Sequence, residues 1–198
     1  MSTKMKIILI ILGIAFLAFL IVQLFALKSQ KDIETYSYQV IETFDKFEIR
    51  NYEESLFTSV KVSSKGYKNS ASSGFSILAG YIFGGNDKNE KIAMTSPVAM
   101  TLEDSMTVMF MVPKKLKKEN LPKPNQSKIE FKEMPAKTVA AIRFNGWAND
   151  KKIAKFKQEL TTALDAKQIK YTNHFYFLGY NAPYEVFGRK NEIIVELE

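Results

Sequence analysis

Apolar and polar residues alternate in two parts of the chain that follow the same plan. Residues 47–52 and 57–62 alternate in this way, and residues 129–134 and 139–144 repeat the pattern 82 positions later. A period of two predicts strands with one buried face. Each pair of strands is followed by a helical pattern and then by two further strands, so the second half of the chain repeats the first.

This repeat predicts an α+β domain over residues 38–198, made of two pseudo-repeats at 38–112 and 128–198. One half of about 80 residues cannot easily bury its sheet face alone, whereas two halves packed about a pseudo-twofold axis can. Their junction is the expected place for a ligand groove. The expected strands lie near 38–52, 55–63, 92–102 and 106–112, matched by 128–134, 137–145, 174–181 and 191–197, with Pro97 matching Pro183 and Val108 matching Ile194.

One helix is expected in each half. Apolar residues at steps of three and four predict a helix within 67–83 and another over about 149–166. Gly84 stops the first helix, and Asn149 or Asp150 can cap the second. The apolar stripes are Ala71, Phe75, Leu78 and Ile82 in the first helix, and Ile153, Phe156, Leu160, Ala163 and Leu164 in the second.

The start of the chain has a different character. A mostly apolar run over 7–27 follows Lys4 and Lys6 and is broken only by Gly13 and Gln23. As a helix, this run spans roughly 31 Å, which is enough to cross the hydrocarbon core of a bilayer.

We predict that residues 1–27 are an uncleaved, single-pass membrane anchor and that residues 28–37 tether it to the domain. The alternative is a cleavable signal peptide, but the apolar run is longer than such peptides have, and it does not end in a small-x-small site. Basic residues lie on both sides of the run with a slight excess before it. The positive-inside rule therefore favours an internal N-terminus and a domain in the periplasm or outside the cell.

Composition leaves room for this one domain and limits its chemistry. The chain has 198 residues, of which 46% are hydrophobic, and it contains no cysteine. Disulfides, zinc-thiolate sites and cysteine nucleophiles are therefore excluded. The connection at 113–124 holds five lysines but no aromatic residues. We interpret it as a solvated linker rather than a nucleic-acid surface, with contact to anionic lipid as the remaining alternative.

Three motifs point to one protein family. They are Gly-Asn-Asp-Lys at 85–88, Ile-Ala-Met-Thr-Ser-Pro-Val at 92–98, and the segment 179–193. In this order and spacing they resemble the signatures of the SOUL haem-binding protein family, and the resemblance covers roughly residues 38–197. It implies a SOUL-like distorted β-barrel or paired antiparallel sheets, with two helices and internal pseudo-twofold symmetry. It also implies binding of haem or a related tetrapyrrole in an apolar groove.

The resemblance further implies which residues bind the ligand. In this family the first helix forms one wall of the groove, and a loop near the C-terminus faces it. Haem carriers of the family place basic residues along this helix, whereas this chain has serines and Gly80 there, which weakens the expected contacts to haem propionates. For Phe75 and Ile82 the alternative is simple packing on the sheet. The implied site residues are Phe75, Leu78, Ala79 and Ile82 on the helix, and Tyr180, Pro183, Tyr184 and Phe187 in the loop.

Residues for metal binding or catalysis are few. His174 is the only histidine, so a metal site with two histidines is excluded, and a role as haem ligand is weighed against a local role at the start of a strand. The methionines in and around the predicted strands are interpreted as core or pocket wall. They are Met94, Met100, Met106, Met109 and Met111.

Three functions stay open, and the first is our prediction. It is a membrane-tethered binding protein for haem or a related tetrapyrrole, with the bilayer contacted through residues 7–27 and no nucleic-acid partner. The second is a carrier or sensor of other apolar or cationic small molecules, because the fold resembles regulator effector domains and Glu185 lies near the groove. The third is a hydrolase that uses Glu185 with Tyr180 or Tyr184.

Overall fold

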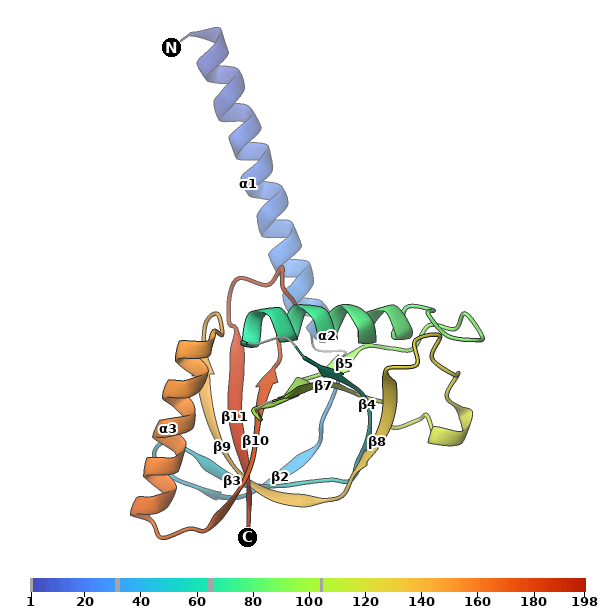
Figure 1. Ribbon diagram of the computed structural model, residues 1–198. Coiled ribbons are helices and arrows are strands. Elements are labelled where there is room, and N and C mark those ends of the chain that lie inside the picture. The colour runs from blue at the N-terminus through green and yellow to red at the C-terminus, as the bar shows by residue number, and fades with distance from the viewer. Residues whose placement is uncertain (1, 31–32, 64–65, 104) are drawn as a thin grey trace.

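The computed structural model describes residues 2–30, 33–63, 66–103 and 105–198. Helix α1 (Thr3–Gln30) leaves the domain as a separate rod (Figure 1). Its part from Thr3 to Leu24 is long and apolar enough to cross a membrane. The structure differs from the expected tether over 28–37, because α1 continues to Gln30 and β1 (Glu34–Thr35) already pairs with β5 (Thr95–Ser96).

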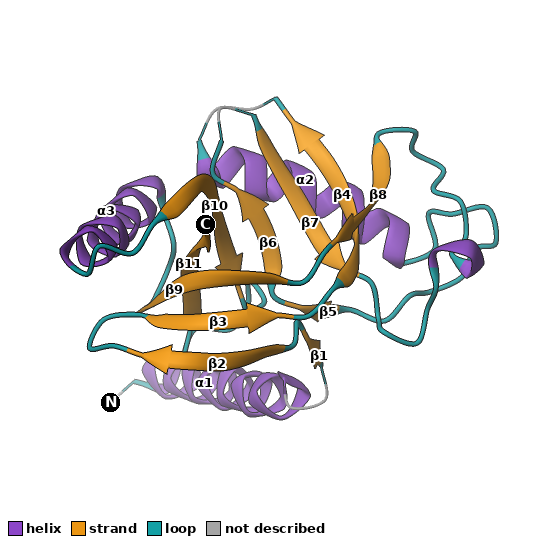
Figure 2. Cartoon of the chain, turned by 90° about the horizontal axis from the view of Figure 1, so that it is seen from below, coloured by secondary structure: helices purple, strands orange, loops and turns teal. Residues whose placement is uncertain are grey.

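In the described residues, nine strands form one antiparallel sheet that curls into a half-barrel (Figure 2). Its order is β2-β3-β9-β11-β10-β6-β7-β4-β8. The strands of the first half are β2 (Tyr38–Thr43), β3 (Glu48–Tyr52), β4 (Ser55–Val62), β6 (Val98–Thr101) and β7 (Met106–Met111). Those of the second half are β8 (Ile129–Met134), β9 (Lys137–Asn145), β10 (Tyr171–Gly179) and β11 (Lys190–Leu197).

This strand order confirms the internal repeat. Between β3 and β8 the order is symmetric about its centre. Counted inward from the two ends, β3 corresponds to β8, β9 to β4, β11 to β7, and β10 to β6. The pseudo-twofold axis therefore passes between β6 and β10, which pair directly. One strand of each half pairs with a strand of the other half: β3 of the first half pairs with β9, and β8 of the second half pairs with β4. Neither half has a complete sheet without its counterpart.

The two main helices occupy equivalent places on this sheet. Helix α2 (Tyr67–Ile82) packs on β4 and β7, and α3 (Asp150–Ala166) packs on the corresponding strands β9 and β11 (Figure 1). As expected, the Asn149 side chain caps α3 by accepting a hydrogen bond from the Lys152 amide at 2.9 Å. A short 3₁₀ helix, η1 (Lys118–Asn120), lies in the lysine-rich connection.

The sheet separates two apolar clusters. The cluster under the helices includes Val108, Ile193 and the predicted helix stripes. The cluster on the opposite face is rich in tyrosine and methionine; its members include Tyr36, Tyr52, Met109, Met111, Tyr176 and Ile194.

Three expected details are wrong. Residues 38–52 form two strands joined by a turn rather than one strand. Pro97 precedes β6 whereas Pro183 follows β10, so the two prolines do not correspond. Val108 and Ile194 lie in corresponding strands but on opposite faces of the sheet. A fixed offset fails because loop lengths differ between the halves, and a shift of one residue moves a strand side chain to the other face.

Candidate functional site

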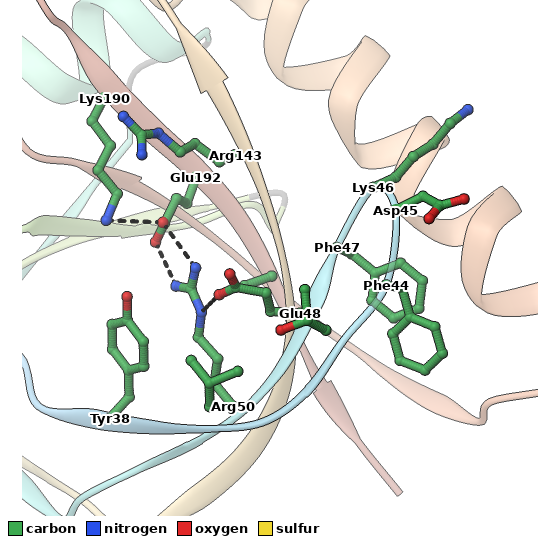
Figure 3. Close-up of a pocket in the computed structure, with 13 residues that line it drawn as sticks. Tyr38, Phe44, Asp45, Lys46, Phe47, Glu48, Arg50, Arg143, Lys190 and Glu192 are labelled. Atoms are coloured by element: carbon green, nitrogen blue, oxygen red, sulfur yellow. Dashed lines mark hydrogen bonds and ion pairs between the residues drawn. The ribbon is translucent and has the colours of Figure 1, made fainter.

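A buried ion pair joins the two halves on the face of the sheet opposite the helices. Arg50 of β3 and Glu192 of β11 meet in a two-pronged contact, with Nη1–Oε2 at 2.9 Å and Nη2–Oε1 at 3.2 Å (Figure 3). Their side chains are 5% and 0% exposed. Tyr180 Oη donates to Glu192 Oε2 at 2.6 Å, and Lys190 Nζ lies 3.0 Å from Oε1. Both oxygens of the buried carboxylate are therefore satisfied.

These contacts fix the protonation states of the cluster. Burial raises the pKa of Glu192, but the hydrogen bonds and charge of Arg50, together with Lys190 and Tyr180, outweigh it and hold this pKa below its ordinary value. Burial and the charge of Glu192 raise the pKa of the Tyr180 phenol. At neutral pH the cluster thus contains an ionised carboxylate and a protonated phenol.

A cavity of about 410 Å³ opens beside this ion pair (Figure 3). Its volume falls in the range of small-molecule pockets. The Arg50 guanidinium covers the ring of Tyr38 at 4.2 Å from the ring centroid and closes one side. The charged residues in the wall are the cations Lys46, Arg50, Arg143 and Lys190 and the carboxylates Asp45, Glu48 and Glu192.

A second cavity, of about 560 Å³, lies on the other side of the β2–β3 turn, against α3. Phe44 and Phe47 stack in this turn with ring centroids 4.5 Å apart. Ala163 and Ala166 of α3 line the facing wall, and Lys46 and Lys167 are also part of the lining. The carboxylates of Asp45 and Glu159 line it as well, so the cavity combines apolar walls with charges of both signs.

The structure places the four predicted helix residues in or near the core. Three of them are buried on the face of α2 that packs on the sheet, namely Leu78, which is 0% exposed, Ala79 and Ile82. Phe75 is half-buried, with its ring 5.3 Å from that of Phe110. These residues pack on the sheet, which is the alternative to a groove wall given above for Phe75 and Ile82. None of them lines either cavity described above.

The four predicted loop residues are divided between two places. Tyr180 belongs to the buried charged cluster and points away from the helix side of the sheet. Pro183, Tyr184 and Phe187 are exposed, in the loop between β10 and β11. The charge of Arg189, at the end of this loop, opposes the rise that burial causes in the pKa of the Tyr67 phenol at the start of α2.

The β10–β11 loop keeps its shape through its own polar groups. Arg189 Nη1 donates to the carbonyls of Ala182 at 2.9 Å and Glu185 at 2.6 Å. Asn181 accepts from the Lys190 amide at 2.7 Å and donates to the Glu185 carboxylate at 2.7 Å. Glu185 is thereby buried inside its own loop and does not line either cavity.

The remaining candidates lie apart from these places. His174 is exposed, with Nδ1 3.5 Å from Glu103 Oε1 at the surface. Met100, Met109 and Met111 are buried in the core, as expected, whereas Met94 is 37% exposed. In the part of the chain that the structure describes, no group of three acidic or histidine side chains gathers in a way that could hold a metal ion.

The palindromic sheet with one helix per half defines the class of protein: an α+β domain made of two copies of one motif. Among solved structures, the C-terminal domain of EcmrR matches with a TM-score of 0.60 over 81% of this chain and 98% of that one, at 13% identity. A hydrolase from Listeria innocua matches with a TM-score of 0.57 over 80% and 94%, at 9% identity. At these identities the likeness concerns the fold alone.

The chain belongs to the family described as "SOUL heme-binding protein", whose sequence model matches residues 33–196. "Heme-binding protein 1" of Bos taurus is 28% identical over 174 residues, covering 81% of this chain and 90% of that protein. "Heme-binding protein 2" of Mus musculus is 29% identical over 158 residues, covering 74% and 76%. The family resemblance of the motifs is thus confirmed.

Proposed function

We propose that this protein binds haem or a related tetrapyrrole and is held at a membrane by α1, with its domain in the periplasm or outside the cell. The observation that carries the binding function is the family match, which spans the whole domain from residue 33 to residue 196. The fold supplies the exposed aromatic surface that a flat, amphipathic ring needs.

Two observations support anchoring by α1. The helix can cross a bilayer by length and composition. It also contacts the folded domain, because the Gln23 side chain is hydrogen-bonded to the β10–β11 loop. A signal peptide that is removed has no such role in the mature fold, so these contacts favour an anchor that stays on the protein.

For the ligand, we propose the surface between the start of α2 and the β10–β11 loop. Tyr184 and Phe187 are each 57% exposed there, and Phe75 is the accessible residue of the predicted helix wall. The buried face of α2, with Leu78, Ala79 and Ile82, packs on the sheet and holds the helix in place. Arg189 already donates to loop carbonyls, so we expect the propionates to stay in water and the affinity to be modest.

The two other functions find less support in the geometry. A cationic ligand that used the buried Glu192 carboxylate in the cavity of Figure 3 would have to displace Arg50, which would leave a buried guanidinium without its main partner. A hydrolase would need Glu185 to face a substrate, but Glu185 is buried within its loop and accepts a hydrogen bond from Asn181.

Haemin titration of residues 33–198, followed by Soret absorbance, tests both the function and the site. Tyr184→Ala removes an exposed aromatic ring, so the fold should persist while affinity falls by about tenfold or more, because lost aromatic contact costs ~1.5–3 kcal/mol. Phe44→Ala, whose ring lines both cavities, is the matched control and should leave the affinity unchanged. The reverse pattern would move the site to the cavities that Phe44 lines, and absence of saturable binding by the wild-type domain would refute the function.

A further inference from the structure

Gln23 differs from its neighbours on α1. Gln23 is 6% exposed, whereas all the remaining residues from Thr3 to Leu24 are exposed. It is also the one side chain in the apolar run that carries a polar group. A polar side chain in lipid is stable only when it has a hydrogen-bond partner, so its surroundings indicate what the helix meets.

The partner of Gln23 is the backbone of the β10–β11 loop. Gln23 Nε2 donates to the Tyr184 carbonyl at 3.0 Å, and Gln23 Oε1 accepts from the Val186 amide at 3.1 Å. Four residues earlier on the same helix face, Phe19 meets Phe187 edge to face, with ring centroids 6.4 Å apart. Helix and loop therefore contact each other over two successive turns, and Figure 1 shows the loop beside the base of α1.

The loop combines several hydrogen-bonded backbone groups with outward apolar side chains. Besides the bonds to Gln23, the Glu185 amide donates to the Ala182 carbonyl, and Arg189 donates to the carbonyls of Ala182 and Glu185. The exposed side chains are Tyr184, Val186 and Phe187, at 57%, 43% and 57%. Irregular backbone at membrane depth is tolerated only where its polar groups are satisfied by protein. The loop meets this condition at the Glu185 and Val186 amides and at the Ala182, Tyr184 and Glu185 carbonyls, and in the interfacial layer its other backbone groups have water and headgroups as partners.

The position of Gln23 along α1 sets the depth of the contact. Gln23 lies four residues before the end of the apolar run, which is ~6 Å along a helix. Interfacial segments bury their apolar side chains about 5–10 Å into the boundary between headgroups and acyl chains. Trp147, 52% exposed and stacked under Arg189 at 3.9 Å, adds an aromatic residue of the kind enriched at this level.

We infer that the β10–β11 loop is a second membrane contact: it lies in the interfacial layer of the bilayer that α1 crosses, and Gln23 holds it there. The inference rests on the proposed anchoring by α1. It fixes the orientation of the domain, with the loop side toward the lipid, so that a hydrophobic ligand reaches the loop directly from the bilayer.

The absence of cysteine allows a direct test with single-cysteine variants of the full chain. Val186→Cys and Ile41→Cys, each labelled with the environment-sensitive dye NBD, are reconstituted in phosphatidylcholine liposomes with or without doxyl-labelled lipid. Ile41 is the matched control because it is an exposed apolar residue, 59% exposed, on strand β2. We expect blue-shifted emission and loss of fluorescence with doxyl lipid at position 186, and water-like, unquenched emission at position 41.

Gln23→Leu then separates the loop contact from the anchor. Leucine keeps α1 apolar but removes both hydrogen bonds, so we expect the label at 186 to lose its quenching while the protein still resists extraction by alkaline carbonate. Water-like emission at 186 in an otherwise wild-type, carbonate-resistant protein would overturn the inference and leave the anchor intact. Carbonate extraction of the wild-type protein would instead refute the anchor itself. Unchanged quenching in Gln23→Leu would overturn the role given to Gln23.

Discussion

Replacing Arg50 by methionine should destabilise the domain far more than breaking an ion pair at the surface. The variant leaves the Glu192 carboxylate buried, with Lys190 at 3.0 Å and Tyr180 at 2.6 Å as its remaining partners. Removing one partner of a buried pair costs about 3–5 kcal/mol, and because two partners remain we expect the lower end, about 3 kcal/mol. This is a large part of the ~5–15 kcal/mol that stabilises an ordinary domain.

Urea unfolding of residues 33–198 measures this loss. With an m-value of about 2 kcal/mol/M, the midpoint should fall by about 1.5 M. Lys114→Met is the matched control, since Lys114 and Glu53 also form an ion pair, at 2.6 Å, but their side chains are 50% and 51% exposed. An exposed pair contributes about 0–1 kcal/mol, so its midpoint should hardly move.

The pH dependence gives a second signature. In the wild-type domain the pKa of Glu192 is held below its ordinary value, so its contribution to stability is present above about pH 4.3 and is lost as the pH falls through the folded-state pKa. Without Arg50, burial is opposed less and this pKa rises. The deficit of the variant should therefore be largest at neutral pH and shrink toward about pH 4.5, as Glu192 takes up a proton. Equal losses in Arg50→Met and Lys114→Met, with no pH dependence, would refute the reasoning.

Two further predictions concern α2. A Cβ at Gly74 would lie 2.4 Å from Val108 Cγ2, whereas a Cβ at Gly80 would meet nothing within 4 Å. Gly74→Ala should therefore lower stability by about 1–3 kcal/mol through overpacking, while Gly80→Ala should raise it by up to about 1 kcal/mol; equal shifts in thermal melting would contradict the close helix–sheet contact. Leu78→Asp should unfold the domain. Leu78 is 0% exposed, so the substitution would bury an unpaired carboxylate at a cost of several kcal/mol. A folded Leu78→Asp variant by circular dichroism would reopen the helix-wall role of this residue.

The architecture could be predicted from the sequence because each half repeats local signals. Alternation in β3 and β9 and the apolar stripes of α2 and α3 are properties of short segments, and the repeat then fixes how the halves pair. The equivalence of Pro97 and Pro183 could not be predicted reliably, because it depends on loop lengths and not on local pattern.

The long-range contacts were harder to predict. Arg50 and Glu192 are 142 residues apart, and neither position is apolar. A signal was nevertheless present: Arg50 shares a strand face with Tyr52, and Glu192 shares one with Ile194, so both charges lie on faces that also carry buried side chains. Gln23 looked like an interruption of an apolar run, and its bonds to Tyr184 and Val186 depend on tertiary structure alone.

Titration of the domain over residues 33–198 with haemin, metal-free protoporphyrin and a lipophilic quaternary ammonium cation tests the central claim most directly. We predict saturable 1:1 binding of haemin and protoporphyrin with affinities within about tenfold of each other, because burial of the ring faces drives binding. The cation should not bind saturably beside Glu192, since this carboxylate is already paired with Arg50. Saturable binding of the cation together with no saturable binding of either tetrapyrrole would contradict the proposed function.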